Sequence, residues 1–146
     1  MPEIETAKGV QLLDLMLDFF ADDGRWARGC YDDGNGGHCL VGALLHLSRK
    51  HCLPKAPAIG LLQDAMPRPG LPLVHFNDRC CGSVAELRSI ILKARRLADH
   101  HAEQEQAAAA AKTWLLAQIE KKRAAPAAPT AETTPDELFI PSRLAA

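Results

Sequence analysis

The strongest constraint on the fold is an uninterrupted stretch from Ser83 to about Arg123 that contains no helix-breaking residue. It opens with Ser83 and Glu86, the Ser-x-x-Glu pattern of a helix capping box. Apolar residues follow at helical spacing, and positions 107–111 are all alanine, the best helix former. As one helix the stretch would be about 60 Å long, twice the diameter of a small domain. Its second half must therefore pack on another chain or fold back near residue 101.

Three further helices are predicted before this stretch, at residues 4–21, 39–51 and 58–65. The Gly- and Asp-rich residues between the first two predict an irregular loop, in which residues 26–31 form a short strand or one side of a small hairpin. Three prolines between 67 and 72 predict an extended segment at 71–76. The fold class is mainly α: a compact four-helix domain with an irregular Trp-containing loop or small hairpin, and a long C-terminal helical extension.

The domain organisation follows from length and from local composition. The chain has 146 residues, enough for one ordinary domain and too few for two. We predict a compact domain at 1–101 and a helical arm at 102–123 that continues the last core helix. Residues 124–146 are rich in Ala, Pro and Thr. A segment of this composition cannot bury enough apolar surface to offset the chain entropy lost on folding, so we predict a disordered tail.

Charge and hydropathy argue against two classes of protein. The 17 basic and 18 acidic residues give a net charge of -1, without the strongly basic face of a nucleic-acid binder. No apolar run approaches the ~20 residues of a membrane span. The acidic opening, residues 1–5, does not resemble a signal peptide. We expect a cytoplasmic protein whose five cysteines are reduced thiols, with no bound cofactor.

Three segments together resemble an uncharacterised bacterial domain family of unknown function. They are residues 24–29 (Gly-Arg-Trp-Ala-Arg-Gly), residues 39–44 (Cys-Leu-Val-Gly-Ala-Leu) and residues 76–78 (Phe-Asn-Asp). Their order is that of the family: helix, Trp-x-x-Gly, Cys-Leu-x-Gly-Ala, then an aromatic-Asn-Asp before the last core helix. The resemblance covers about residues 10–98. It implies a domain boundary and no activity.

One enzymatic hypothesis is a cysteine-dependent hydrolase or transferase that uses Cys39. At the start of a helix, the free N–H groups and the macrodipole would favour its thiolate and supply part of an oxyanion hole. His75 would be the base, oriented by Asn77 or Asp78. The competing interpretation makes Cys39 a small core residue, because its segment resembles a buried helix.

Histidines and cysteines also raise the question of zinc. The available ligands include the adjacent pairs His38-Cys39 and Cys80-Cys81, with His51-Cys52 at a helix end. Adjacent residues on regular structure point in different directions, and no Cys-x-x-Cys pair is present. We therefore predict no metal site.

The leading functional prediction is a non-enzymatic interaction or regulatory protein. Trp114, Leu115 and Ile119 restore an apolar face in the arm, which favours a protein partner or self-association through the C-terminal helix. Trp26 and Asn77, with Asp78, form a second candidate surface. The alternative for these three is a structural role, in which they tie the loop to the last helix.

Overall fold

The structure is a computed structural model that describes residues 2–125. The chain divides into two compact units, Met1–Glu105 and Gln106–Ala146. Almost all of the predicted tail lies outside the described residues.

The mainly α fold is confirmed. The helices are α1 (Pro2–Phe19), α2 (Leu40–His51), α3 (Ala56–Ala65), the short α4 (Leu73–His75) and α5 (Val84–Ala124). The predicted stretch from Ser83 is thus a single helix of 41 residues, without a break near residue 101. Within residues 2–125, no helix is both long enough and apolar enough to cross a membrane.

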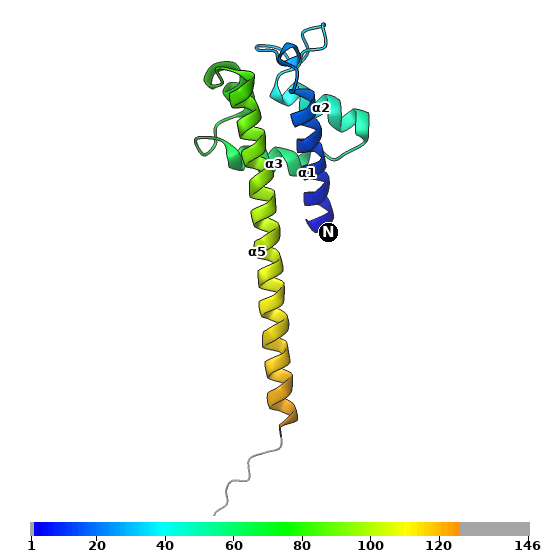
Figure 1. The fold of residues 1–146 in the computed structure, drawn as a ribbon, viewed down its shortest axis with the longest axis vertical. Coiled ribbons are helices and arrows are strands. Elements are labelled where there is room, and N and C mark those ends of the chain that lie inside the picture. The colour runs from blue at the N-terminus through cyan, green and yellow to red at the C-terminus, as the bar shows by residue number, and fades with distance from the viewer. Residues whose placement is uncertain (1, 126–146) are drawn as a thin grey trace, which may run out of the picture. The chain divides into compact units, whose positions relative to one another are not determined.

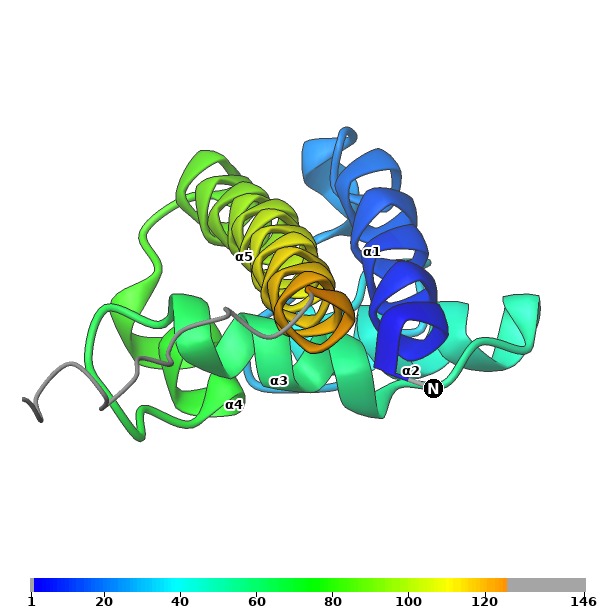
Figure 2. The ribbon, with the colours of Figure 1, turned by 90° about the horizontal axis from the view of Figure 1, so that it is seen from below.

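The first unit has two layers. In Figures 1 and 2, α1 and the beginning of α5 lie side by side and antiparallel, and α2 and α3 cross beneath them. Arg95 of α5 is 3.1 Å from Asp14 of α1, an ion pair that links the two upper helices at the surface. Fully buried side chains from these four helices, and Phe20 just after α1, fill the space between the layers; the helical ones are Leu12, Met16, Leu40, Leu44, Leu62, Leu87 and Ile91.

The start of α5 carries the predicted cap with one difference. Ser83 Oγ accepts a hydrogen bond from the N–H of Glu86 at 3.2 Å, as a capping box requires. The Glu86 carboxylate accepts from the N–H of Gly82 at 2.7 Å, one residue before the position expected of it. The two bonds fix the direction in which the chain enters α5.

The extended segment predicted at 71–76 is wrong. After Pro72 the chain turns through α4 and then through a wider, π-helical turn, η2 (Phe76–Cys80). Leu73 and Phe76 are both buried. In an extended strand they would face opposite sides, whereas three-residue spacing on a helical turn lets both reach the core. Pro72 permits this because its carbonyl accepts the hydrogen bond of Phe76 N–H at 2.9 Å.

The irregular loop is observed, but the strand at 26–31 is not, because the part of the chain that the structure describes contains isolated bridges and no strand. A 3₁₀ turn, η1 (Asp23–Arg25), follows α1. Isolated bridges then join His38 to Trp26 and to Asp32. Gly29, Gly34 and Gly36 have positive φ, and these bends prevent a continuous strand.

Candidate functional site

Asn77 is the centre of a buried hydrogen-bond network. Its side chain has no exposed surface, and its Oδ1 accepts from Trp26 Nε1 at 2.8 Å and from the N–H of Leu40 at 3.0 Å. Its Nδ2 donates to the carbonyl of Ala27 at 3.0 Å and to Asp78 Oδ1 at 2.8 Å. All four bonds agree with one orientation of the amide. One side chain therefore ties the Trp-containing loop to the first N–H of α2.

The π-helical turn places Asn77 in this position. Phe76 anchors the turn in the core, and its carbonyl accepts from the N–H of Cys81 at 2.9 Å. On the facing loop, the Arg28 guanidinium lies over the Trp26 ring, 4.7 Å from its centre, and donates to the carbonyl of Cys81. The loop and the turn thus hold each other across about 50 positions of sequence.

Asp78 belongs to the same network. Its Oδ1 accepts from the N–H of Gly29 at 3.0 Å as well as from Asn77. These two hydrogen bonds stabilise the charged carboxylate and lower its pKa, with burial acting weakly in the other direction. Asp78 is therefore an ionised acceptor that fixes the loop at Gly29 and orients the Asn77 amide.

Cys39 lies where the sequence predicts, at the N-cap of α2. Its Sγ accepts from the N–H of Gly42 at 3.2 Å, and only 2% of the residue is exposed. Burial raises the pKa of the thiol and outweighs the lowering by the helix N–H groups. The N-cap position was expected to favour the thiolate, and the observed burial instead favours the neutral thiol.

Within the described residues, no hydrogen-bonded catalytic array links Cys39 to His75 and Asp78. His75 is exposed on α4, and the hydrogen bonds of Asp78 go to Gly29 and Asn77. Among residues 4–125, no hydrogen bond joins the side chains of Cys39, His75 and Asp78. The catalytic role stays a prediction, without a hydrogen-bonded array to support it.

Gly42 allows the loop to lie directly on α2. A Cβ at this position would overlap the carbonyl oxygen of Tyr31. The same carbonyl lies 2.8 Å from Nδ1 of His38, which must therefore carry the proton as donor. The close approach explains a glycine within the apolar first half of α2.

Sequence reasoning missed an aromatic cluster at the end of α1. The His38 and His46 rings stack at 4.8 Å, and the Phe19 ring lies 5.4 Å from His38. The Arg25 guanidinium lies over Phe19 at 5.2 Å. The pKa of His46 is lowered, first by burial and then by the neighbouring His38, Lys50 and Arg49. The imidazole of His46 is therefore held towards its neutral form.

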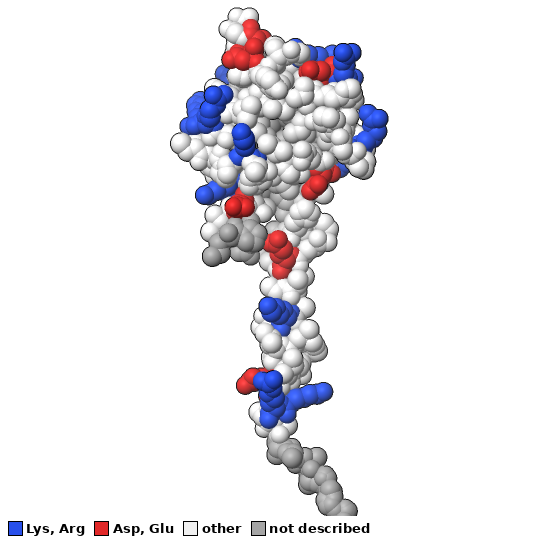
Figure 3. Space-filling model, turned by 180° about the vertical axis from the view of Figure 1, so that it is seen from behind, with Lys and Arg blue, Asp and Glu red and all other residues white. Residues whose placement is uncertain are grey.

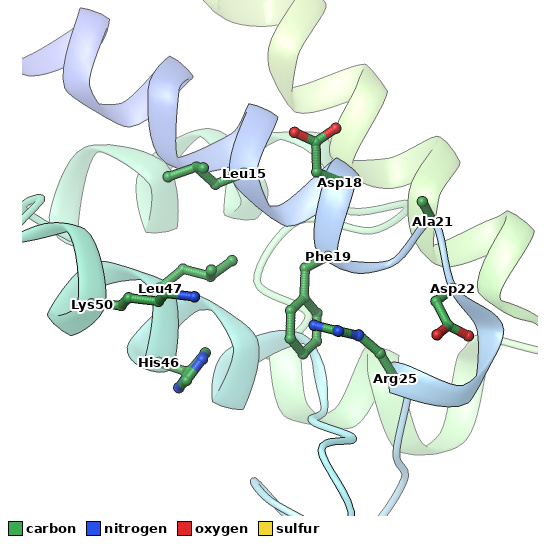
Figure 4. Close-up of a pocket in the computed structure, with 9 residues that line it drawn as sticks. All are labelled: Leu15, Asp18, Phe19, Ala21, Asp22, Arg25, His46, Leu47 and Lys50. Atoms are coloured by element: carbon green, nitrogen blue, oxygen red, sulfur yellow. The ribbon is translucent and has the colours of Figure 1, made fainter.

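An open pocket of about 480 Å³ lies beside this cluster, between α1 and α2 (Figure 4). In the close-up, Arg25 lies against the Phe19 ring, while His46 and Lys50 project from α2. Asp18 and Asp22 add acidic groups to the same rim. The mixed charges select no single class of ligand.

Metal ligands do not converge in the described residues. Within them, no group of three or more His, Cys, Asp or Glu side chains could hold a metal ion.

Acidic and basic side chains are interspersed over the face in Figure 3.

The apolar side chains of α5 in the second unit are exposed. The exposed fractions are 61% for Trp114, 53% for Leu115 and 48% for Ile119, and Leu116 between them is 56% exposed. At 3.6 residues per turn, Leu115 and Ile119 lie about 40° apart around the helix. We call Leu115, Leu116 and Ile119 the α5 contact face; Trp114 lies about 100° from Leu115 on the side away from Leu116.

Comparisons with protein-family models, with curated proteins and with solved structures found no match to this chain. The resemblance of residues 10–98 to a bacterial domain family therefore stays a hypothesis.

The network at Asn77 contains residues that the sequence motifs indicated and one that they did not. Trp26, Asn77 and Asp78 all belong to it, but it ties the loop to the π-helical turn and to the start of α2, whereas the structural alternative expected a link to the last helix. Arg28 was not singled out, although it lies between Trp26 and Gly29 of the Trp-x-x-Gly motif. A local pattern does not reveal that its guanidinium reaches a carbonyl 53 residues away.

Proposed function

We propose that this protein acts by protein–protein contact through the α5 contact face rather than by catalysis. The observation that carries the proposal is the exposure of four large hydrophobic side chains within six residues, each between 48% and 61% exposed. Single exposed hydrophobic residues are ordinary on a protein surface, whereas a cluster of them marks an interaction site. An apolar helix face is also a common element of partner recognition.

The candidate surface at Trp26, Asn77 and Asp78 has its polar groups occupied internally. The polar atoms of Asn77 and the Oδ1 of Asp78 are bonded to the loop and to each other. Within the described residues, every buried side-chain nitrogen or oxygen has a hydrogen-bond partner. In the first unit, Trp26, Asn77 and Asp78 are thus bonded within the fold, whereas Leu115, Leu116 and Ile119 in the second unit are exposed within five consecutive positions.

The experiment replaces two residues of the face and compares them with two on the opposite side of the helix. Leu115→Glu with Ile119→Glu puts two charges into the face. Thr113→Glu with Ala117→Glu has the same spacing and adds the same charge, about 180° away. All four positions are exposed, so neither variant should unfold the chain.

We expect the full-length chain and the Thr113/Ala117 variant to form the same complex, measured as mass in solution and as binding to any identified partner. The Leu115/Ile119 variant should lose it. Equal binding by both variants would exclude the α5 contact face.

The cysteine-dependent alternative makes a contrary prediction for thiol labelling of the folded protein at neutral pH. Cys30, Cys52 and Cys80 are exposed, while Cys39 and Cys81 are buried. We expect three fast and two slow thiols, because labelling requires an accessible thiolate. Rapid modification of Cys39 would revive the enzymatic hypothesis.

A further inference from the structure

The sequence of α5 has a charge on either side of the α5 contact face, with opposite signs at the two ends. Glu105 precedes the face, and Lys122 and Arg123 follow it. Glu105 and Arg123 are 18 residues apart, which is five full turns, so they occupy the same angular position on the helix. That position lies within about 40–80° of Leu115 and Ile119, close enough for both charges to border an interface made by this face.

The residues between these charges divide by size. The alanine run at 107–111 comes first, and the large side chains of Leu115 and Ile119 follow. Ala108 lies on the same side of the helix as these two. Small residues allow a neighbouring helix to approach closely and leave space for larger side chains.

A second copy in antiparallel orientation would match the opposite charges at the two ends and also pair small residues with large ones. If two helices cross near residues 112–114, Ile119 faces Ala108 of the other copy and Leu115 faces Ala111. The same register places Glu105 beside Lys122 and Arg123 of the other copy. A parallel pair would instead bring the basic ends together, where like charges repel.

We propose that the α5 contact face binds a second copy of this chain in antiparallel orientation. The inference rests on the proposed function and names its partner. Such an interface is isologous, because each copy contributes the same acidic end, alanine run, apolar residues and basic end. Lys112 lies within about 20° of Ile119 around the helix, and its aliphatic stem can lie along the apolar residues while its ammonium group stays in water.

Charge exchange tests the orientation by sedimentation equilibrium over a concentration series. At both ends of the antiparallel dimer, Glu105→Arg places an arginine beside Lys122 and Arg123 of the other copy, and Arg123→Glu places a glutamate beside Glu105 while Lys122 remains. We expect each to weaken dimerisation by about fivefold or more, since exposed ion pairs contribute modestly and the exchange makes them repulsive. The two exchanges combined restore opposite charges and should restore the dimer to near the wild-type dissociation constant.

Matched controls carry the same kinds of charge change away from the interface. Glu103 and Lys121 share an angular position on the far side of α5 from Leu115 and Ile119. Glu103→Arg and Lys121→Glu should therefore leave the dissociation constant within about twofold. The double exchange also controls for helix stability, because it retains the glutamate near the helix C-terminus that the single Arg123→Glu variant introduces.

Each outcome supports or overturns the proposal. Weakening by both single exchanges, with recovery in the double exchange, supports the antiparallel dimer. If the charge exchanges leave the dissociation constant of the dimer unchanged, the antiparallel orientation is wrong. If the chain is a monomer and the Leu115/Ile119 variant loses binding to an identified foreign partner, this inference is wrong and the proposed function stands. A monomer in which the Leu115/Ile119 variant changes nothing overturns both.

Discussion

The two units of this chain are stabilised in different ways. In residues 1–105, Asn77 and Arg28 bond to groups about 50 positions away, and the core side chains come from helices and turns along the whole unit. In residues 106–124, every side chain is exposed and the helix contains only local hydrogen bonds, such as Thr113 Oγ1 to the carbonyl of Ala109 at 3.0 Å. The first region therefore depends on packing, whereas the second depends on the intrinsic helix preference of its residues.

This difference separates the roles of similar residues. A leucine in the first region contributes to folding, and a leucine in the second exposes apolar area that a partner can cover. Substitutions should therefore have opposite consequences for stability and for binding in the two regions.

The largest contrast is expected between two leucines of the same helix. Leu87 is fully buried, and Leu87→Ala should lower the free energy of unfolding by about 3–4 kcal/mol through lost burial and a cavity. Leu115→Ala should change it by less than about 0.5 kcal/mol in the monomer. Urea unfolding followed by circular dichroism measures both. Similar losses would mean that Leu115 packs inside its own chain.

Asn77→Ala should lower the free energy of unfolding by about 2–3 kcal/mol. The substitution leaves Trp26 Nε1, the N–H of Leu40 and the carbonyl of Ala27 without their partner, and unpaired buried groups are costly. Gln104→Ala on exposed α5 is the control and should stay within about 0.5 kcal/mol. A loss below about 1 kcal/mol at Asn77 would show that water replaces the network.

Two glycines in helices provide a matched pair. Gly42→Ala should cost about 1–2 kcal/mol, because the new methyl group overlaps the Tyr31 carbonyl and must displace the loop. Gly60 of α3 has open space around its Cβ position, so Gly60→Ala should stabilise the chain by about 0.5–1 kcal/mol. The midpoint of thermal unfolding shows whether each substitution stabilises or destabilises the chain. A stabilising Gly42→Ala would place the loop away from α2.

Acid should destabilise the first unit through His46. Because the folded-state pKa of His46 is lowered, the unfolded chain binds more protons below about pH 6.5. This contribution to stability is therefore complete above about pH 6.5 and is lost as the pH falls towards the folded-state pKa. His46→Phe keeps a ring against Phe19 and His38 without the proton.

Urea midpoints from neutral to mildly acidic pH should fall for the wild type and stay flatter for His46→Phe. Asp78 acts separately, since its lowered pKa removes stability only as the pH drops below its unfolded-state value of about 3.8. Parallel curves for the two proteins above that range would assign the acid sensitivity to another group.

The smallest effect on unfolding is expected in the arm. Ala109→Gly should reduce helix content locally, at a cost of about 1 kcal/mol to the helix, and leave the urea midpoint of residues 1–105 unchanged. The measurement is best made on the Leu115/Ile119 glutamate variant, so that the self-association proposed above does not intervene. A shifted midpoint would show that the arm contributes to the stability of the first unit.

Much of the helical fold was predictable because its signals are local. Periodic apolar residues located α1, α2 and α3 to within about two residues, and Ser83 with Glu86 located the start of α5. The failures lie in the segments rich in glycine and proline. The prolines before Leu73 suggested an extended chain, but the burial of Leu73 with Phe76 favoured a helical turn.

The candidate site shows the same division residue by residue. The sequence indicated Trp26, Asn77 and Asp78 by their motifs, and it indicated Trp114, Leu115 and Ile119 by their spacing. It did not disclose the Arg28 bond to Cys81, the stack of His38 on His46 or the burial of the Cys39 thiol.

By itself, the sequence determined that the chain forms helices and where most of them begin and end, because capping, periodicity and helix preference act over a few residues. Only the tertiary structure decided that Asn77 is a buried junction and that Cys39 is enclosed. Both depend on which loop covers the start of α2, and that is fixed by hydrogen bonds and close packing between segments far apart in the chain.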